Sequence, residues 1–553
     1  MDILSVLADR LAERDPLWRF PEAGRETRLS ALSAAAARYA ANLRASGVAK
    51  GSRVALLMEN HPAYAPLLLA IWSLEAIAVP LRPAGRNFDF GPYLRSIHRT
   101  CGFGALIFPD PAEAAPIAAW ASESGVACLD AAGLEREPAG PVAPLRSAGA
   151  GARDIAVIQY SSGSTGDPKG VMVTHGMMLA QLRQINTQLA EGCRGMVLRS
   201  SASWLPFHHD MGLFIGLLNP IFAGADNLLA SPRFYMMNPK RWFALMADCA
   251  VDLNFTTNSA MQAGLRAMKR MAPLDLSRFY ICLAAEKVHP ATLAEAYRIL
   301  GPSGMTEANF RVGYGLAENT LGATSTLGPR IEVNRFRFDA AGKVEPAPAD
   351  AAGALEIASL GQPHAGTRIS IRDDEGRELP ELRLGEIAIE GECVMPGYFN
   401  NPEATLRALD GTRLRTGDLG FRFRGELYFH SRKDDLLIVG GRNIVPDDVE
   451  AKVEELDFVR PAGSVLVGCE KDGTGEMELV LLVEVKDHES MEEALQADLR
   501  GRIRNQAFDA CGVLVNRVLL GGNGAIEKTS SGKKRRKWIG SRIRSAGLAA
   551  GKA

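Results

Sequence analysis

Short apolar runs alternate with helical patterns through the first four-fifths of this 553-residue chain. Residues 53–58, 105–108 and 279–284 read as strands, and residues 62–75 read as a buried helix that follows the first of them. Such alternation is typical of parallel β-sheets covered by helices. The pattern therefore predicts an α/β fold whose large N-terminal domain contains parallel sheets.

A chain of this length exceeds what one hydrophobic core usually holds, so at least one smaller domain is expected. The N-terminal domain is predicted to span residues 1–431. Past about residue 365 the strand patterns become closely spaced, which predicts a small β-barrel-like subdomain over residues 365–431. Its strands are expected at residues 368–373, 385–392 and 426–431.

The C-terminal residues read as a compact α+β unit. Residues 436–553 combine strand and helix patterns in a length that suits an independent lid domain. The polar run SRKDD separates two apolar strands just before this unit. We therefore predict a hinge at residues 432–435.

Composition and charge exclude several classes of protein. Hydrophobic residues make up 47% of the chain, charged residues 23%, and the formal net charge is −1. These values are typical of a globular enzyme, and this charge recruits neither nucleic acid nor membranes. The longest apolar stretch, residues 63–81, contains prolines and a glutamate, so it predicts a buried helix and strand instead of a membrane span. The amphipathic N-terminus is not expected to be a signal peptide.

Eight cysteines and nine histidines are spread along the chain without CxxC pairs or metal-ligand spacing. Scattered cysteines are typical of reduced thiols in the cytoplasm, which is the location we expect. No metal site built from protein ligands alone is predicted.

The segment SSGSTGDPKG, residues 161–170, has the composition of a phosphate-binding loop. Glycines let the backbone approach a ligand, while hydroxyl groups, N–H groups and a lysine surround its anionic oxygens. The Walker pattern is absent, because no Lys-Ser/Thr pair follows the last glycine. A solvated linker is the alternative, but linkers seldom lie between a strand such as 154–160 and an amphipathic run such as 171–182. The predicted phosphate-binding residues are Ser161, Ser162, Gly163, Ser164, Thr165, Gly166 and Lys169.

This loop resembles the phosphate loop of adenylate-forming enzymes, the superfamily of acyl-CoA synthetases, amino-acid adenylation domains and luciferases. Taken singly, Glu318 and Asp418 read as surface or turn carboxylates, Tyr314 as core, and the basic run around Lys533 as a tail or nucleic-acid patch. Matches in one order over nearly the whole chain argue against those readings. The matching segments are 205–213, 284–286, 314–320, 416–418, Arg432 and 527–537.

The resemblance implies roles for individual residues. The expected catalytic set is Lys533, Glu318 as the Mg²⁺ ligand, and His209 at the mouth of the acid pocket. Because His208 and His209 are adjacent, at most one is expected to face the site. Asp434 is the expected hinge residue. The expected ATP-binding residues are Ala284, Ala285 and Glu286 against the adenine, Tyr314 on the base with Gly315, Leu316 and Ala317, Thr320 on a phosphate, Asp418 on the ribose, and Arg432.

Adenylate formation is the reaction that this resemblance implies. A carboxylate attacks the α-phosphorus of ATP, and cations must offset the repulsion between the two anions. Mg²⁺ at Glu318, Lys169 and the loop amides are expected to offset the pyrophosphate charge, while Lys533 bridges the acid and the α-phosphate. A thiol then attacks the acyl-AMP after the lid swings about Asp434. No Ser-His-Asp or Cys-His set is visible, and none is needed.

Within the superfamily the chain is most similar to the fatty acyl-AMP ligases, which load fatty acids onto acyl carrier proteins. Residues 203–213, SWLPFHHDMGL, are near that family's motif, and Arg442 stands where CoA ligases commonly have Glu. Residues 321–360 lie where that family carries an insertion that hinders CoA use. Residues 331–339 within it are a candidate strand pair, and a plain surface loop stays an open alternative.

The acid pocket is expected to be apolar, but its length stays open. Residues 254–262 depart from the family pattern, His208 replaces a tyrosine, and Asp434 is closer to CoA ligases. The candidate lining residues, which core packing explains equally well, are Met211, Phe214, Ile215, Phe255 and Met261.

We therefore expect a cytoplasmic, Mg²⁺- and ATP-dependent acid–thiol ligase that makes acyl-AMP from a fatty or similarly apolar acid. Its expected acceptor is the phosphopantetheine of a holo acyl carrier protein, in lipid, polyketide or lipopeptide biosynthesis. Transfer to CoA is the nearest alternative, and a catalytically silent ATP- or acyl-binding protein is an alternative of another class. The basic residues 533–537 either meet an acidic carrier protein or are simply solvated. The charge balance argues against a nucleic-acid binder.

Overall fold

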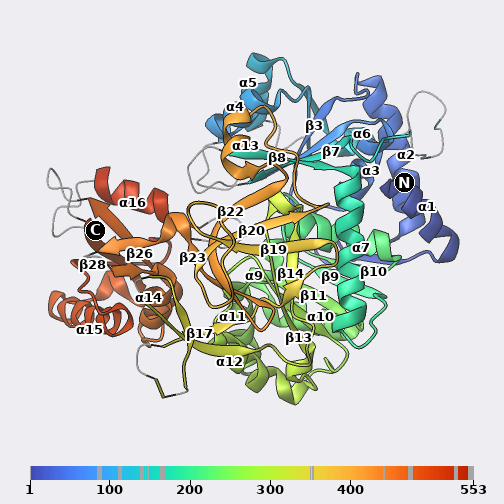
Figure 1. Ribbon diagram of the computed structural model, residues 1–553. Helices are drawn as coiled ribbons and strands as arrows, with labels where there is room; N and C mark the ends of the chain where they lie inside the picture. Colours follow the sequence, from blue (N-terminus) through green and yellow to red (C-terminus); the bar gives the residue numbers. More distant parts are fainter. Residues whose placement is uncertain are drawn as a thin grey trace.

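The computed structural model shows the expected α/β fold, with a large N-terminal part and a smaller C-terminal domain (Figure 1). It describes residues 2–83, 90–109, 115–136, 142, 145, 149–161, 168–339, 341–348, 350–351, 354–439, 442–470, 477–528 and 534–545.

The first sheet is parallel except at one edge. Its strands run in the order β6-β5-β3-β4-β7-β8, and only β7 and β8 pair antiparallel. The predicted buried helix is α3 (Tyr64–Ser73), which is almost entirely apolar and buried. The strands are β3 (Arg53–Leu57), β4 (Ile77–Leu81), β5 (Ala105–Phe108), β6 (Ala127–Asp130), β7 (Ile155–Ser161) and β8 (Lys169–Thr174).

A nine-stranded second sheet, in the order β18-β14-β13-β12-β11-β9-β10-β1-β2, places the site. The six strands from β13 to β1 pair in parallel, so their carboxyl ends meet at one edge. The strands are β1 (Leu17–Phe20), β2 (Arg25–Arg28), β9 (Ser200–Ser203), β10 (Asp226–Leu229), β11 (Leu253–Thr256), β12 (Tyr280–Leu283), β13 (Phe310–Gly315), β14 (Gly322–Ser325) and β18 (Gln362–Pro363).

Helices connect and cover these two sheets. The amphipathic N-terminal helix is present as α1 (Ile3–Glu13), capped by the Asp2 side chain. The long helix α7 (His175–Gly192) contacts β8, β14 and the π-helix η2 (Gly212–Leu218). The others are α2 (Leu29–Ala45), α4 (Phe90–Cys101), α5 (Ala115–Ser124), α6 (Ala131–Glu135), α8 (Asn219–Ala223), α9 (Pro232–Met237), α10 (Pro239–Asp248), α11 (Asn258–Met268), α12 (Pro290–Leu300), η3 (Gly301–Ser303), η4 (Glu307–Asn309) and η5 (Ala317–Asn319).

The predicted β-rich region is an antiparallel sheet in which β23 joins the path β19-β20-β22-β21 through β22. All three strand runs predicted past residue 365 are strands of this sheet. Its elements are β19 (Thr367–Arg372), β20 (Gly385–Gly391), α13 (Pro402–Ala408), β21 (Leu409–Asp410), β22 (Arg413–Phe423) and β23 (Glu426–Arg432).

Residues 321–360 contain more than a surface loop. Residues 331–339 do not form a strand pair, because β15 (Val333–Phe338) instead pairs with two later strands, β16 (Val344–Pro346) and β17 (Leu355–Ala358). Phe336 is fully buried and packs edge-on against Phe421 and Tyr428 of the β-rich sheet. This aromatic core attaches the segment to β22 and β23.

The C-terminal domain has an α+β fold with its own hydrophobic clusters. In the described part of the chain its strands pair only with one another. The predicted hinge segment contains the short turn η6 (Lys433–Asp435), and the boundaries at 431 and 436 stay predictions. Its elements are β24 (Leu437–Val439), β25 (Arg442–Ile444), α14 (Pro446–Val453), β26 (Val459–Glu470), β27 (Met477–Val485), η7 (His488–Ser490), α15 (Glu493–Cys511), β28 (Arg517–Gly521) and α16 (Arg536–Ser545).

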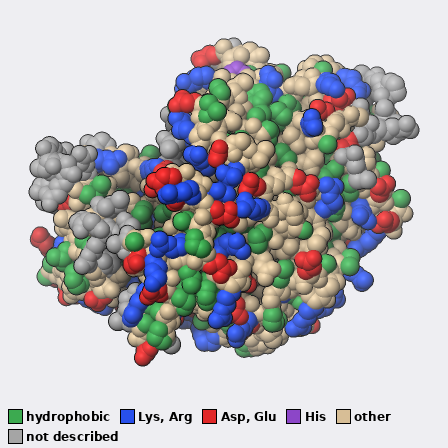
Figure 2. Space-filling model, in the orientation of Figure 1, with side chains coloured by type: hydrophobic (Ala, Val, Ile, Leu, Met, Phe, Trp, Pro, Cys, Tyr) green, Lys and Arg blue, Asp and Glu red, His purple; other side chains and the backbone are tan. Residues whose placement is uncertain are grey.

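The surface carries both signs of charge. Figure 2 shows Lys and Arg side chains interspersed with Asp and Glu over the visible face, in keeping with the net charge of −1. Among the described helices, none combines the length and apolar character needed to cross a bilayer.

Candidate active site

A cavity of about 1990 Å³ opens where the carboxyl ends of the parallel strands meet the β-rich sheet and the C-terminal domain. In open α/β sheets, ligands bind outside the carboxyl ends of the strands. The structure brings most of the predicted residues that it describes to this cavity: Lys169, His209, Met211, Ile215, Phe255, Ala284, Ala285, Glu286, Tyr314, Gly315, Leu316, Ala317, Glu318, Asp418, Arg432 and Asp434.

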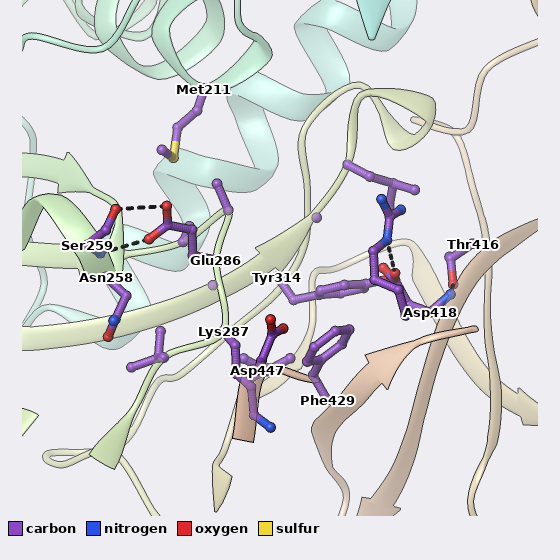
Figure 3. A pocket seen from close by; sticks show the side chains of 18 of the residues that line it. Met211, Asn258, Ser259, Glu286, Lys287, Tyr314, Thr416, Asp418, Phe429 and Asp447 are labelled. Atoms are coloured by element: carbon purple, nitrogen blue, oxygen red, sulfur yellow. Dashed lines mark hydrogen bonds and ion pairs between the residues drawn. The ribbon is translucent and has the colours of Figure 1, made fainter. Parts of the chain in front are cut away.

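Asp418 is held between Tyr314 and Arg432. It lies opposite Arg432 in the β22–β23 pair, and Arg432 Nε donates a hydrogen bond to Oδ1 at 3.0 Å. The Tyr314 hydroxyl, at the end of β13, donates to Oδ2 at 2.8 Å. The Asp418 charge raises the pKa of Arg432 and burial raises the pKa of Tyr314, so both groups keep their protons. The result is an oriented carboxylate that can accept hydrogen bonds from two neighbouring hydroxyl groups (Figure 3).

Glu318 and Lys169 meet at one aromatic ring. Tyr398 donates its hydroxyl to Glu318 Oε1 at 2.8 Å, and Lys169 Nζ lies 5.4 Å from the centre of the Tyr398 ring. A cation over an aromatic face is attracted by the ring quadrupole. Tyr398 therefore positions both the predicted metal ligand and the predicted phosphate lysine. Sequence reasoning missed Tyr398, although the Pro-Gly turn before it is a local signal.

The segment after β12 turns sharply beside the cavity. Ala285 has a φ of 68°, in the left-handed region that residues with a side chain seldom adopt. The Glu286 carboxylate accepts hydrogen bonds from Ser259 N at 2.7 Å and Ser259 Oγ at 2.9 Å (Figure 3). An acidic group at the start of α11 also complements that helix's dipole. Glu286 therefore lines the cavity while it holds α11 in place.

Two predicted groups lie outside the described residues: Lys533, and the loop residues Ser162, Gly163, Ser164, Thr165 and Gly166. Of Ser161 only the backbone is described, and it lies opposite Lys169 in the β7–β8 hairpin. The flanking residues Lys169 and Lys534 both line the cavity. The roles of the loop and of Lys533 stay predictions.

Both adjacent histidines line the cavity, where at most one was expected to face the site. They lie in a turn, so their side chains do not alternate as they would along a strand. Burial lowers the pKa of His208 to about 3, which keeps its ring neutral. His209 Nδ1 lies 2.5 Å from Asp210 Oδ1, and a quarter of its side chain is exposed.

The π-helix η2 shapes one wall of the predicted acid pocket. A Cβ atom on Gly212 would lie 2.1 Å from the Pro206 carbonyl oxygen, so this helix packs closely on the segment that follows β9. Met211, directly before this helix, and Ile215, within it, line the cavity together with Phe255. π-helices are rare and frequently occur at functional sites.

Phe214, Met261 and Thr320 depart from the predictions, since none of them lines the cavity. Phe214 and Met261 are 0% and 1% exposed and belong to the hydrophobic core. An apolar side chain fits a core as well as a pocket wall, so residue type alone did not separate the two. Thr320 has a φ of 63°, is completely buried, and donates its hydroxyl to the Cys393 carbonyl oxygen at 2.8 Å. Its hydroxyl is therefore not directed at a phosphate.

A family model described as AMP-binding enzyme matches residues 12–399, which is more than half of the chain. The chain belongs to the AMP-binding enzymes. This ATP-utilising, adenylate-forming family accounts for the order of motifs around the cavity. The enzyme's resemblance to the fatty acyl-AMP ligases is confirmed by curated relatives and by a solved structure of that description.

Three curated relatives of this AMP-binding enzyme come from mycobacteria. The 4-hydroxyphenylalkanoate adenylyltransferase of Mycobacterium marinum is 33% identical over 71% of this chain and 66% of its own length. The long-chain-fatty-acid–AMP ligase FadD26 of Mycobacterium tuberculosis is 32% identical over 71% of this chain and 70% of its own length. The putative fatty-acid–CoA ligase fadD25 of Mycobacterium tuberculosis is 31% identical over 90% and 88%, respectively.

A solved structure shares the fold of this AMP-binding enzyme over nearly its full length. It comes from a study of fatty acyl-adenylate ligases from E. coli and L. pneumophila and superposes with a TM-score of 0.88. The two chains are 25% identical, and the match covers 99% of this chain and 98% of the other.

Glu318 fits a Mg²⁺ ion that arrives with the nucleotide. Mg²⁺ is usually held by one or two carboxylates together with substrate phosphates and water. In the described part of the enzyme, no cluster of three His, Cys, Asp or Glu side chains could hold a metal by itself. Glu318 lines the cavity, and its one hydrogen bond from Tyr398 leaves lone pairs for a cation.

Proposed function

We propose that this AMP-binding enzyme joins a fatty or similarly apolar carboxylic acid to AMP, with release of pyrophosphate. One observation carries the proposal: a single cavity joins the oriented Asp418 carboxylate and Glu318 to an apolar wall formed by Met211, Ile215 and Phe255. A site for a nucleotide alone does not need an apolar extension of this kind.

In this proposal the chain contributes position and charge. Asp418 holds the ribose hydroxyls, and Tyr314 lies against the base. Lys169 and Lys533 offset the negative charge of the phosphates and the acid, and a Mg²⁺ ion at Glu318 supplies further positive charge when bound. The acid's own carboxylate is the nucleophile, so the protein need not provide one.

The proposed acceptor of the acyl group is the phosphopantetheine thiol of a holo acyl carrier protein. The name of the FadD26 relative supports a fatty acyl-AMP product. The strands β15 to β17 are anchored by Phe336 to β22 and β23, the strands that lead into the predicted hinge. An insertion anchored at this place would restrain the movement of the lid. Such restraint disfavours free CoA as the acceptor.

Transfer to CoA is the second candidate function. It is favoured by the relative named putative fatty-acid–CoA ligase, which matches 90% of this chain, and by Asp434, which the sequence places nearer to CoA ligases. The cytoplasmic location and a role in lipid, polyketide or lipopeptide biosynthesis remain proposals that depend on the family.

The test is pyrophosphate release from purified protein given Mg²⁺, ATP and a panel of acids from short to long chain. Release that depends on the acid supports adenylate formation, whereas ATP binding without release under every condition contradicts it. Isolated acyl-AMP on the enzyme is then offered CoA, a holo carrier protein and the same carrier without phosphopantetheine. Discharge by the holo carrier alone supports the proposed acceptor, and equal discharge by CoA supports the second candidate.

A further inference from the structure

From the predicted acid pocket the cavity continues beneath α7, along one face of the nine-stranded sheet. Cys282 lies opposite Phe255 in one strand pair, and Gly313 lies opposite Ser325 in another. Cys282 also lies opposite Arg311, two residues before Gly313 on β13, and residues opposite each other or two apart share a face of a sheet. All five residues line the cavity. This face therefore forms the floor of a tunnel that leads away from the nucleotide end.

Helix α7 covers this floor and runs alongside β14 in the same chain direction. The Gln181 amide nitrogen would lie 3.8 Å from a Cβ atom on Gly322, while Gln188 accepts a hydrogen bond from Ser325 Oγ at 2.9 Å. Gly322 lies opposite Gly315, beside Tyr314, and so marks the nucleotide end. Seven residues of helix and two to three of strand separate the Gln188–Ser325 contact from that end, roughly 7 to 10 Å.

Several polar groups in this part of the tunnel form hydrogen bonds within the protein. The Arg311 guanidinium donates hydrogen bonds to the carbonyl oxygens of Gly192, Ala308 and Phe310. The Thr326 hydroxyl accepts from the Val312 N–H group, and the Thr324 hydroxyl donates to the Leu360 carbonyl oxygen. Except for Arg311 Nε, which is buried without a hydrogen-bond partner among the described residues, these groups hold the tunnel wall together and are not available to a ligand.

Gln188 differs from these groups. Its side-chain oxygen accepts the hydrogen bond from Ser325, which orients the amide. Its amide nitrogen has no hydrogen-bond partner among the described residues, although Gln188 is only 9% exposed and lines the cavity. Its neighbours on the tunnel side of α7 are the apolar residues Ile185 and Leu189. The amide nitrogen is therefore a donor beside the cavity that can bond an acceptor oxygen of a bound ligand.

We propose that Gln188, oriented by Ser325, binds an acceptor oxygen in the tail of the acid, roughly 7 to 10 Å beyond the Gly315–Gly322 pair. The acid is then an apolar acid that carries a hydroxyl, phenol or carbonyl oxygen along its chain, and a plain alkyl acid is the poorer substrate. The inference rests on the proposed adenylation of an apolar acid and names the substrate class of that same site. A pocket built to bond an oxygen disfavours the analogue that lacks it, because the donor is then left buried without a partner.

The test compares acids that differ only by the oxygen. Straight-chain acids are paired with their terminally hydroxylated forms, and phenylalkanoic acids with their para-hydroxy forms, over a range of lengths. For at least one pair we expect the oxygenated acid to have the higher kcat/KM for pyrophosphate release, by about tenfold, the value of one net hydrogen bond. The two series distinguish an aliphatic hydroxyl from a phenol as the source of the oxygen.

The variant Gln188→Leu is expected to abolish or invert this preference, mainly through KM for the acid. Ser325→Ala leaves the amide in place without its orienting partner, so a smaller loss in the same direction is expected. The matched control is Gln181→Leu, the same change two turns earlier on α7, at a completely buried residue that does not line the cavity. It should keep the wild-type preference.

The tunnel route has its own check at Gly313. A Cβ atom there would meet the Thr324 carbonyl oxygen at 3.4 Å and Cys282 Sγ at 3.8 Å, so a side chain fits and projects over the floor. Gly313→Val is expected to lower kcat/KM for acids that reach Gln188 and to spare shorter ones.

The outcomes separate this inference from the proposed function. If no acid releases pyrophosphate, the proposed function fails. If acids release pyrophosphate but the plain acid is preferred at every length, only the inference about Gln188 is overturned. An unchanged preference in Gln188→Leu overturns it as well.

Discussion

Lys287 Nζ lies 2.5 Å from Asp448 Oδ1, and this ion pair joins the segment after β12 to helix α14 of the C-terminal domain. Both side chains are largely buried, with 11% and 21% of their surface exposed. Lys287 also donates a hydrogen bond to the His430 carbonyl oxygen at 3.4 Å, at the end of the β-rich sheet. The pair therefore ties three parts of the molecule together beside the cavity, which Lys287 and Asp448 both line.

We predict that Lys287→Met slows acyl-AMP formation about tenfold, because it leaves Asp448 partly buried without its partner in the closed arrangement. Transfer from preformed acyl-AMP to a thiol should change much less, because the lid is expected to leave this position for that step. Single-turnover measurements of the two half-reactions check this. The control is Lys269→Met, which removes the exposed Lys269–Glu295 pair. Equal slowing of both half-reactions contradicts the prediction.

Asp418→Asn is predicted to lower kcat/KM for ATP about tenfold or more, because the ribose acceptor loses its charge and Arg432 loses its anionic partner. Tyr314→Phe keeps the ring and removes one hydrogen bond to Asp418, so a decrease of only a few fold is expected. ATP-dependent pyrophosphate exchange at saturating acid measures both. A Tyr314→Phe defect larger than that of Asp418→Asn would show that the hydroxyl has another role.

The variant Lys533→Ala is predicted to abolish acyl-AMP formation while ATP binding is largely kept. The neighbouring variant Lys534→Ala provides a contrast, because Lys534 Nζ lies 2.8 Å from Glu450 Oε2 and 2.9 Å from Glu454 Oε1 within the C-terminal domain. Its loss should lower the unfolding temperature and should have little effect on the rate of acyl-AMP formation. Adenylate yield, ATP binding and thermal unfolding are measured for both. Wild-type adenylation by Lys533→Ala refutes the catalytic assignment.

Buried histidines predict acid sensitivity of the fold. Burial lowers the pKa of His208 to about 3 and those of His364 and His430 to about 4, below the ordinary value near 6.5. The stability from these neutral rings is fully present above pH 6.5. This stability falls by up to about 1.4 kcal/mol per pH unit for each ring as the pH drops towards 4. The reason is that the histidines of the unfolded chain then bind protons more readily than those of the folded chain.

Urea unfolding between pH 7.5 and pH 5 measures this loss. His364→Asn is expected to flatten the dependence of the unfolding free energy on pH, and His488→Gln in the surface turn η7 serves as the matched control. A profile that is the same in His364→Asn and in the wild type contradicts the assignment to this ring.

Much of the nucleotide end of the site could be predicted from the sequence, because its residues lie in short motifs. Tyr314 and Glu318 lie close together in the sequence, and Asp418 directly follows Thr416 and Gly417 in β22. The strand and helix patterns likewise predicted the parallel sheets and the smaller α+β domain. Local spacing and side-chain chemistry are sufficient for such features, since each motif carries its own backbone conformation.

Contacts between distant segments were decided only by the tertiary structure. Tyr398 meets Glu318 across 80 residues, and Lys287 meets Asp448 across 161. Packing also sent Phe214 and Met261 to the core and left the Gln188 amide in the tunnel. In the sequence these residues resemble many others of their type. Their roles depend on which elements the folded chain brings together, because burial and an unmatched hydrogen-bonding group exist only once the chain is packed.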